Sequence, residues 1–299
     1  MRKRIAFVLG TILSLNISLI PEIHSATNNY AVWWGDSLTA GAGGNGISAP
    51  SELEKLRKIQ IQNRGVGGEN SSQIAVRSGA KEVNLKFWGK GKKEGDWKVY
   101  DVEPDVQLLR QGMSVIAGNI DKCVTLLKFA GGRYFARVFK CSKDFSGKVK
   151  KISLTGLDNI NAKAKFHLIW SGRNNAHDSQ TVVADIAAMI TNFRRVNPKT
   201  KVYVLSVING ASEGVGTGAY NDITKLNESF INLNAKFVDV RRCLIDEGLS
   251  VNRLKPKSQD EADIASDLVP TQLRSDGIHL NPYGYHAVAF CVNEAITFG

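Results

Sequence analysis

The sequence predicts an α/β fold: a three-layer α/β/α sandwich around a mostly parallel, five-stranded sheet. Short apolar runs alternate with helical patterns, which is typical of a parallel sheet covered on both faces. The chain has 299 residues, enough for one large domain of this kind. Its hydrophobic fraction of 43% and charged fraction of 22% are ordinary for a globular protein with a sizeable core.

Five segments are predicted to be strands because each is short, apolar and bounded by turn residues. The second of them is expected to stop at Asn63-Arg64-Gly65. The five segments are residues 30–34, 59–62, 165–170, 201–208 and 237–240.

Three helices are predicted from apolar residues that recur at helical spacing. The clearest lies between the third and fourth strands and is expected to end at Asn197-Pro198. Its apolar face is formed by Val182, Ile186, Ile190 and Phe193. The remaining two helices are expected at residues 220–233 and from residue 283 to the C-terminus.

One interval is too long for a single strand–helix–strand unit. Such a unit takes about 30 residues, whereas Gly68 and Gly172 are separated by roughly three times that length. The surplus, at about residues 83–159, is rich in lysine and in strand-like runs. We therefore expect a β-rich insertion that interrupts a main domain spanning residues 27–299.

The N-terminus has the layout of a secretory signal peptide. A basic start at residues 1–4 precedes a mostly apolar run at residues 5–20, with small residues at Ser25 and Ala26. We expect residues 1–26 to be removed and the protein to be periplasmic or secreted. A retained anchor is the alternative, although the run is shorter than the ~20 apolar residues of a membrane span. No later segment is predicted to cross a membrane.

Export permits disulfides between the four cysteines. Cys123 and Cys141 each lie nine residues from Gly132, so a hairpin turning there would place them opposite each other. A cross-strand disulfide is the first interpretation, and two buried thiols are the second. Pairing of Cys243 with Cys291 rests only on the even number of cysteines. None of the spacings resembles a CxxC metal site, and we expect no metal and no cofactor.

The formal net charge of +11 favours anionic partners, including an anionic polysaccharide. Export and the absence of a recognition motif argue against nucleic acid. A solvated basic face is the simpler interpretation. Much of the excess charge comes from Lys81, Lys86, Lys90, Lys92, Lys93, Lys98, Lys143, Lys148, Lys150 and Lys151.

Open α/β sheets place their sites just beyond the strand ends, and four blocks in this sequence follow strands or precede the last helix. The first is Gly35-Asp36-Ser37, and the second contains Gly67-Gly68. The third is residues 172–175, which contains Asn174, and the fourth is residues 276–279, with Asp276 and His279 at its ends.

These residue types suit acyl transfer through a serine nucleophile. A serine hydroxyl needs a base to take its proton, and the base needs a partner that fixes its tautomer. Asp276 and His279, three residues apart, can meet across one turn and act on Ser37. The N–H groups of Ser37 and Gly68 and the side-chain amide of Asn174 are candidate donors to the developing oxyanion.

The four blocks, in this order, resemble the SGNH or GDSL hydrolase family, named for its Ser, Gly, Asn and His. The resemblance implies that Ser37, Asp276 and His279 form a catalytic triad and that Ser37, Gly68 and Asn174 form the oxyanion hole. It also implies a flavodoxin-like sandwich. The third block usually reads Gly-x-Asn-Asp, whereas this chain has Asn175 at its last position.

Two further motifs would indicate different chemistry, and neither holds. Residues 41–46 satisfy GxGxxG, but strand two ends in Asn63 rather than an acidic residue, so a dinucleotide site is not expected. The GxSxG elbow of α/β-hydrolases is absent, because Thr39 stands where its last glycine would be. His167, His177 and His286 have no partner pattern and are expected to be structural or surface residues.

The sequence therefore predicts an exported carboxylic ester hydrolase that removes O-acetyl groups from a polysaccharide through an acyl-enzyme. A small ester is an alternative substrate. The same residues also suit a lipid or short-chain esterase, or a thioesterase or acyltransferase of this family. A glycan-binding protein built on this scaffold is the rival from a non-enzymatic class.

Overall fold

The computed structural model describes residues 30–81, 83–87, 95–103, 116–120, 123–130, 133–140, 149–153 and 161–297. The predicted signal peptide lies outside these residues, so export stays a prediction. Within the described part of the chain, no helix combines the length and the apolar character needed to cross a membrane.

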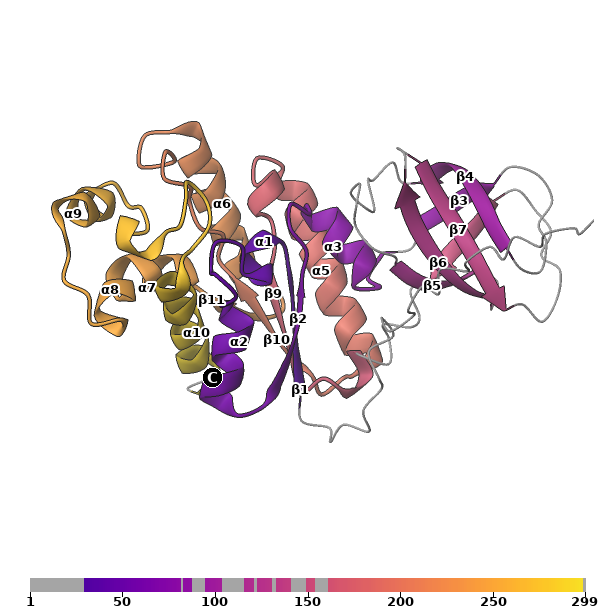
Figure 1. Cartoon of the computed structure of the whole chain (residues 1–299), viewed down its shortest axis with the longest axis horizontal. Helices are drawn as coiled ribbons and strands as arrows, with labels where there is room; N and C mark the ends of the chain where they lie inside the picture. Colours follow the sequence, from indigo (N-terminus) through magenta and orange to yellow (C-terminus); the bar gives the residue numbers. More distant parts are fainter. Residues whose placement is uncertain are drawn as a thin grey trace, which may run out of the picture.

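A five-stranded parallel sheet forms the centre of the main domain (Figure 1). The strand order is β11-β10-β9-β1-β2, and every neighbouring pair is parallel. This confirms the predicted fold class. The strands are β1 (Tyr30–Gly35), β2 (Gln60–Gly65), β9 (Phe166–Trp170), β10 (Lys201–Leu205) and β11 (Lys236–Val238).

Three strand ends differ from the prediction. Strand β11 ends at Val238 rather than at residue 240, because Asp239 caps a helix that begins at Val240. Strand β2 continues through Asn63-Arg64-Gly65 because these residues pair with β1 as far as Gly35↔Gly65. Strand β10 ends at Leu205 rather than at residue 208, because the chain then turns away from the ladder. The next residues find different partners: Ser206 N–H donates to the carbonyl of Val238, and Val207 N–H donates to Asn227 Oδ1.

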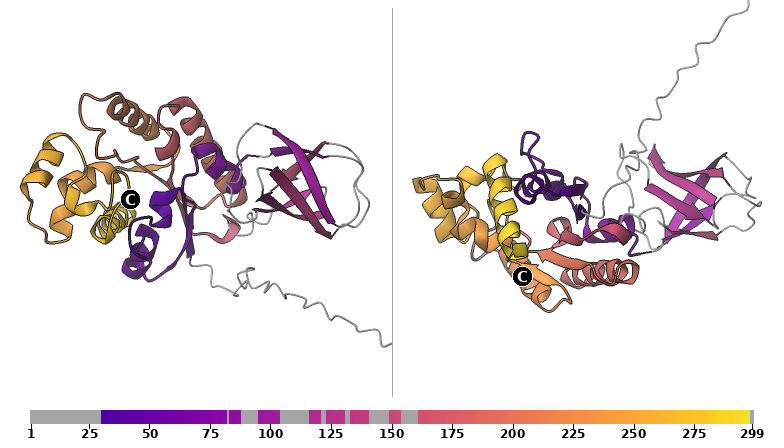
Figure 2. Two further views of the ribbon diagram at one scale, coloured as in Figure 1. Left: turned by 45° about the horizontal axis from the view of Figure 1, so that its top comes forward. Right: turned by 90° about the horizontal axis from the view of Figure 1, so that it is seen from below.

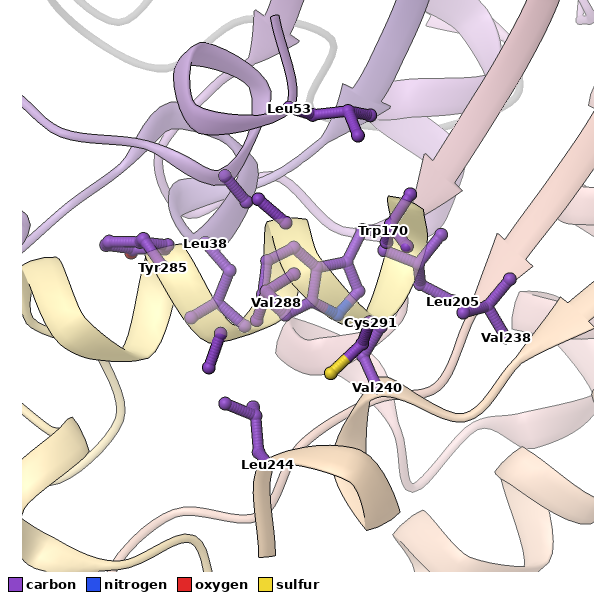
Figure 3. Close-up of a cluster of buried hydrophobic side chains, with 14 of the residues drawn as sticks. Leu38, Leu53, Trp170, Leu205, Val238, Val240, Leu244, Tyr285, Val288 and Cys291 are labelled. Carbon is purple, nitrogen blue, oxygen red and sulfur yellow. The ribbon is translucent and has the colours of Figure 1, made fainter. Parts of the chain in front are cut away.

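The central strand β1 faces two hydrophobic cores. Trp33 and Trp34 are both fully buried, but alternation along the strand sends them to opposite faces of the sheet. Helices α2, α7, α8 and α10 cover the face of Trp33, and α3, α5 and α6 cover the face of Trp34 (Figures 1 and 2). Figure 3 shows the first core, in which Trp170 and Leu205 of the sheet lie beside Val288 of α10.

The three predicted helices are confirmed with small changes in their ends, as α5 (Ser179–Val196), α6 (Gly218–Ile231) and α10 (Pro282–Thr297). Among the described residues, six shorter helices were not predicted. Two of them, α2 and α3, begin with capping boxes at Ser48 and Asn70. The missed helices are α1 (Ser37–Ala40), α2 (Ala49–Arg57), α3 (Ser71–Arg77), α7 (Val240–Asp246), α8 (Gly248–Val251) and α9 (Ser258–Ala265).

Between α3 and β9 the chain forms a closed barrel of antiparallel strands, ordered β3-β4-β7-β6-β5-β8. Strands β6 and β7 pair as a hairpin from Ala130↔Arg133 onward. Whether residues 83–159 form a domain of their own stays a prediction. The strands are β3 (Val83–Phe87), β4 (Gly95–Glu103), β5 (Ile116–Ile120), β6 (Cys123–Ala130), β7 (Arg133–Lys140) and β8 (Val149–Ser153).

One disulfide joins Cys243 of α7 to Cys291 of α10. It links two helices that pack on the same face of the sheet, and Cys291 lies beside Val240 in that core (Figure 3). The pairing that rested only on the even number of cysteines is therefore present. The predicted bond between Cys123 and Cys141 falls on side chains outside the described part of the structure.

We expect a Cys243→Ala/Cys291→Ala double variant to be less stable. The two cysteines are 48 residues apart, and closing a loop of that length restricts the unfolded chain by roughly 4 kcal/mol. Denaturant unfolding, followed by far-UV circular dichroism, measures the difference. An unfolding free energy equal to that of the wild type would contradict the prediction.

Candidate active site

Ser37 is the first residue of α1, directly beyond the end of β1. Asp36 caps this short helix by accepting the N–H of Leu38 at 3.0 Å. Helix α1 packs closely on the ends of β1 and β2, where glycines make room for it. A Cβ at Gly65 would lie 2.1 Å from the amide nitrogen of Ala40, and one at Gly35 would lie 2.0 Å from Thr39 Oγ1. These two glycines therefore fix where Ser37 sits.

His279 links Ser37 to Asp276 through a continuous chain of hydrogen bonds. His279 Nε2 lies 3.0 Å from Ser37 Oγ, and His279 Nδ1 lies 2.8 Å from Asp276 Oδ2. The second carboxylate oxygen of Asp276 accepts the N–H groups of Ile278 and His279, both at 2.7 Å. The imidazole is thus oriented by one carboxylate that is itself held by backbone donors.

The pKa of Asp276 is lowered to about 2, chiefly because its carboxylate accepts the backbone N–H of His279. The N–H of Ile278 and the imidazole of His279 act in the same direction. Asp276 is therefore ionised across the neutral range and favours the imidazolium that forms when His279 takes a proton.

The loop that carries Asp276 and His279 is held on both sides. Ser275 N–H donates to the carbonyl of His279, and Ala211 N–H donates to that of Gly277 at 2.7 Å. The side-chain amide of Asn281 donates to the carbonyl of Gln272 at 2.8 Å. These contacts keep the triad loop in one conformation.

The predicted oxyanion residues lie on two loops beside Ser37. A Cβ at Gly67 would be 3.9 Å from Ser37 Cβ, so this backbone closely approaches the nucleophile. Gly68 has a φ of +72°, which glycine adopts without strain. Asn174 is exposed in the short 3₁₀ turn η1 (Arg173–Asn175), and its amide Nδ2 donates to the carbonyl of Glu69 at 2.8 Å.

Asn175, where the family pattern has Asp, ties the third block to α3. Its Oδ1 accepts the N–H of Ser71 at 3.2 Å, and its Nδ2 donates to Ser71 Oγ at 3.0 Å. Ser71 and Ser72 both donate to the fully buried carboxylate of Asp185, which also pairs with Lys81. Asn175 therefore braces the turn that carries Asn174.

Lys81, expected among the solvated basic residues, instead belongs to an ion pair with Asp185.

Buried and partly buried charges around these loops were not predicted from the sequence. Arg173 donates to Glu213 at 2.8 Å, and Arg77 donates to Glu69 at 2.7 Å. Asp36 is fully buried, and this burial raises its pKa to about 7, opposed by its hydrogen bond from Leu38 and the nearby Arg173. The signal in the sequence was the presence of charged residues inside the glycine-containing blocks.

Three further histidines lie in the described part of the chain: one is buried, one is paired with a carboxylate and one is exposed. His167 is fully buried and stacks on Phe193 with ring centroids 4.0 Å apart, and burial lowers its pKa to about 3. His286 Nδ1 lies 3.1 Å from Glu52 Oε2, and His177 is exposed. Among the described residues there is no group of three or more His, Cys, Asp or Glu side chains placed to hold a metal ion.

The glycine-rich residues 41–46 form a packed loop that leads to α2. Tyr285 Oη donates to the carbonyl of Ala42 at 2.6 Å, and a Cβ at Gly44 would lie 2.0 Å from the carbonyl oxygen of Ile47. Gly41, Gly43 and Gly44 therefore serve close packing, whereas Gly46 has open space around it and a φ of +87°.

The arrangement can activate a serine hydroxyl. Because His279 is hydrogen-bonded to Ser37 Oγ, it can accept the hydroxyl proton as the oxygen attacks an electrophile. The N–H groups of Ser37 and Gly68 and the side-chain amide of Asn174 are the candidate donors for the negative charge that would develop. Acyl transfer is the reaction class that this set of groups serves.

No family model and no curated protein matches the chain. Solved structures resemble it at low identity. One is described as a lipolytic protein of the G-D-S-L family from Desulfitobacterium hafniense, with 13% identity, a TM-score of 0.49, and coverage of 89% of this chain and 99% of that one. An acetyl xylan esterase has 13% identity, a TM-score of 0.47, and the same coverage of both chains.

A third is a carbohydrate esterase family 2 enzyme with a carbohydrate binding domain, from Corynascus thermopiles (Myceliophthora fergusii). It has 11% identity, a TM-score of 0.47, and coverage of 91% of this chain and 67% of that one. All three TM-scores are below 0.5, so the functional proposal rests on the site itself.

We expect Asp36→Asn to stabilise the protein, increasingly so as the pH rises. An unfolded Asp has a pKa near 3.8 and the folded one near 7, so between these values only the folded state holds the proton. The stability of the wild type should fall over this interval as pH rises. Asn has no charge to desolvate, and its oxygen can still cap α1.

The stability gap between Asp36→Asn and the wild type should be small at pH 4. It should reach the order of 2–4 kcal/mol at pH 8, since a tenfold change in a protonation equilibrium is worth about 1.4 kcal/mol. Denaturant unfolding at several pH values measures the gap. A variant that is less stable than the wild type at pH 8 would show that the carboxylate is needed in its charged form.

Proposed function

We propose that this protein is a serine carboxylic ester hydrolase of the SGNH type. The observation that carries the proposal is the hydrogen-bonded chain from Ser37 Oγ through His279 to Asp276. It joins residues that are 242 positions apart in the sequence. It also matches the roles that the four sequence blocks assign to these residues.

In the first half-reaction, Ser37 Oγ attacks the ester carbonyl carbon while its proton passes to His279 Nε2. The C=O electron pair moves to the carbonyl oxygen and gives a tetrahedral oxyanion. When this intermediate collapses, the bond to the leaving alcohol breaks and His279 returns the proton to that alcohol oxygen. Ser37 is left as an acyl ester.

In the second half-reaction, water takes the place of the alcohol. His279 accepts a proton from the water molecule as the water oxygen attacks the carbonyl carbon of the acyl-enzyme. His279 then donates this proton to Ser37 Oγ when the carboxylic acid leaves. The lowered pKa of Asp276 keeps this residue ionised, so it stabilises the imidazolium twice in each cycle.

Three donors are available for the oxyanion. Ser37 begins α1, and the first N–H groups of a helix have no partner within that helix. Gly68 offers its N–H from the loop that approaches Ser37. The amide of Asn174 has two N–H groups, of which one is fixed on the carbonyl of Glu69 and the second is left for the substrate.

The acyl group is proposed to be short and carried on a polysaccharide. The triad lies at the surface, since 53% of the Asp276 side chain and 26% of the His279 side chain are exposed. Small residues flank it at Ser275 and Gly277, and Ile278, between Asp276 and His279, adds an apolar side chain that is 41% exposed. A long acyl chain would need an extended apolar groove, whereas an acetyl group on a glycan needs mainly an opening through which the polymer can reach Ser37.

The barrel that follows α3 is proposed to contact the polymer, and the protein is proposed to act in the periplasm or outside the cell.

Ser37→Ala should abolish ester hydrolysis, with kcat/KM on nitrophenyl acetate reduced at least about 10⁴-fold because no acyl-enzyme can form. Ser229→Ala, a change on the exposed side of α6, is the matched control and should behave as the wild type. Hydrolysis by Ser37→Ala at the wild-type rate would rule out the proposal.

Asn174→Ala should lower kcat by about 10²–10³-fold with a smaller change in KM, because an oxyanion donor acts mainly in the transition state. Steady-state kinetics on the same ester measure both constants. Asn175→Ala is the neighbouring control and should cost less, because Asn175 contacts Ser71 rather than the substrate. An equal loss of kcat in the two variants would assign Asn174 a bracing role instead.

Acetate release from O-acetylated cell-wall and capsular polysaccharides, with Ser37→Ala as the control, tests the substrate class. We expect release from at least one polymer and a kcat/KM on nitrophenyl acetate at least about tenfold above that on the decanoate. A preference for the decanoate would indicate a lipid esterase. Acetyl groups recovered on an added sugar, rather than as free acetate, would indicate an acyltransferase.

A further inference from the structure

A buried ion pair lies beneath the loop that carries Gly68. Arg77 Nε contacts both carboxylate oxygens of Glu69, at 3.1 and 3.0 Å, and an Arg77 terminal nitrogen lies 2.7 Å from Glu69 Oε2. The Glu69 side chain is 1% exposed and that of Arg77 is 12% exposed. Two residues at either end of α3 are thus joined by charge-assisted hydrogen bonds of fixed geometry.

The pair touches each of the three segments that supply the proposed oxyanion donors. Glu69 follows Gly68 directly, and its own backbone carbonyl accepts the Asn174 amide at 2.8 Å. The Arg77 guanidinium also donates to the carbonyl of Gly35 at 3.3 Å, two residues before Ser37. One side-chain pair therefore connects Ser37, Gly68 and Asn174 through their neighbours.

The surroundings favour an arginine and a carboxylate that stay together. The guanidinium carbon of Arg77 lies 5.4 Å from the centre of the Trp34 ring, so the cation is packed as well as paired. Lysine could not reproduce the hydrogen bonds of Arg77, since it lacks the planar fork that reaches both carboxylate oxygens of Glu69 and the carbonyl of Gly35 together.

We propose that Glu69 and Arg77 form a positioning pair that holds the oxyanion donors in register with Ser37, a role that rests on the proposed esterase function. The backbone carbonyl of Glu69 orients the Asn174 amide. Arg77 binds the side-chain carboxylate of Glu69 and thereby fixes Glu69 against the end of β1. Neither residue touches the substrate. Their effect is on the spacing of the donors, where displacements of about 1 Å can cost 10²-fold in rate.

The test uses Arg77→Lys and Glu69→Gln in the full-length protein, with Asp267→Asn as the control. Asp267 also pairs with a buried arginine, Arg241, but joins α7 to the end of α9. We expect both positioning variants to lose kcat by at least tenfold with KM nearly unchanged. Affinity for a boronic acid that forms a tetrahedral adduct with serine should fall in parallel. Asp267→Asn should lose stability and keep the wild-type kcat.

Crystal structures of the two variants provide a readout that needs no turnover. We expect the Asn174 amide to leave the carbonyl of Glu69 in both. Folded variants with wild-type kcat, wild-type boronic acid affinity and an unchanged Asn174 contact would overturn the positioning role. Failure of the esterase proposal is distinguishable, because it would appear as an inactive wild type or an active Ser37→Ala.

Discussion

The pairing of β1 with both of its neighbours is the constraint on which the site depends. The register pairs Gly35 at the end of β1 with Gly65 of β2 and with Trp170 of β9. Because the three strands are parallel, their carboxyl ends reach the same edge of the sheet at the same level. The chain then needs only two to four further residues to bring Ser37, Gly67-Gly68 and Asn174 together. A slip of one residue would exchange the core-facing sides of β1 and separate these loops.

Two cores hold that register. Trp33 packs into the core under α10 and Trp34 into the core under α3 and α5, so β1 is fixed from both faces. Helix α10 follows the loop of Asp276 and His279, and the same core that anchors the nucleophile strand therefore anchors the base. The disulfide between α7 and α10 strengthens this half of the sandwich. The reactive groups sit on loops, but every loop starts or ends on a rigid element.

Beneath the loops, buried charges replace apolar packing. Glu69–Arg77 and Asp185–Lys81 each place a carboxylate that is almost fully buried against a cation. An unpaired charge at these depths would be costly, so each partner restricts its counterpart. Such pairs specify one loop arrangement, which suits a site whose donors must be aligned before the substrate arrives. Asp36 differs, since burial raises its pKa and its role is to cap the turn that presents Ser37.

The sequence was enough to predict the sheet, its parallel pairing and the meeting of Ser37, His279 and Asp276 in one hydrogen-bonded chain. Strand periodicity located all five strands, and the blocks at their ends located Ser37, Gly68, Asn174 and His279. The end of β2 was wrong because pairing with β1 overrides local turn preferences, and the ends of β10 and β11 were wrong because the chain leaves the ladder earlier than its apolar run. Helices α1 and α3 were missed because each is short and stabilised by capping and packing rather than by a long apolar stripe. The ion pair of Glu69 and Arg77 spans α3, a helix that the sequence analysis did not predict, so their contact across it was not predicted either.

The sequence also did not decide which cysteines form disulfides. The pair with a geometric argument, Cys123 and Cys141, concerns side chains that the structure does not describe. The pair without one, Cys243 and Cys291, is bonded. Their helices pack on the same core, and this proximity follows from the order of the strands rather than from any local motif.

The most direct measurement of the central claim is the site of covalent labelling by a fluorophosphonate, which reacts with activated serines. After digestion of the labelled protein, peptide mass spectrometry should find the adduct on Ser37, and the label should disappear in His279→Ala. A folded wild-type protein that takes no label, or that carries it on a different serine, would contradict the account.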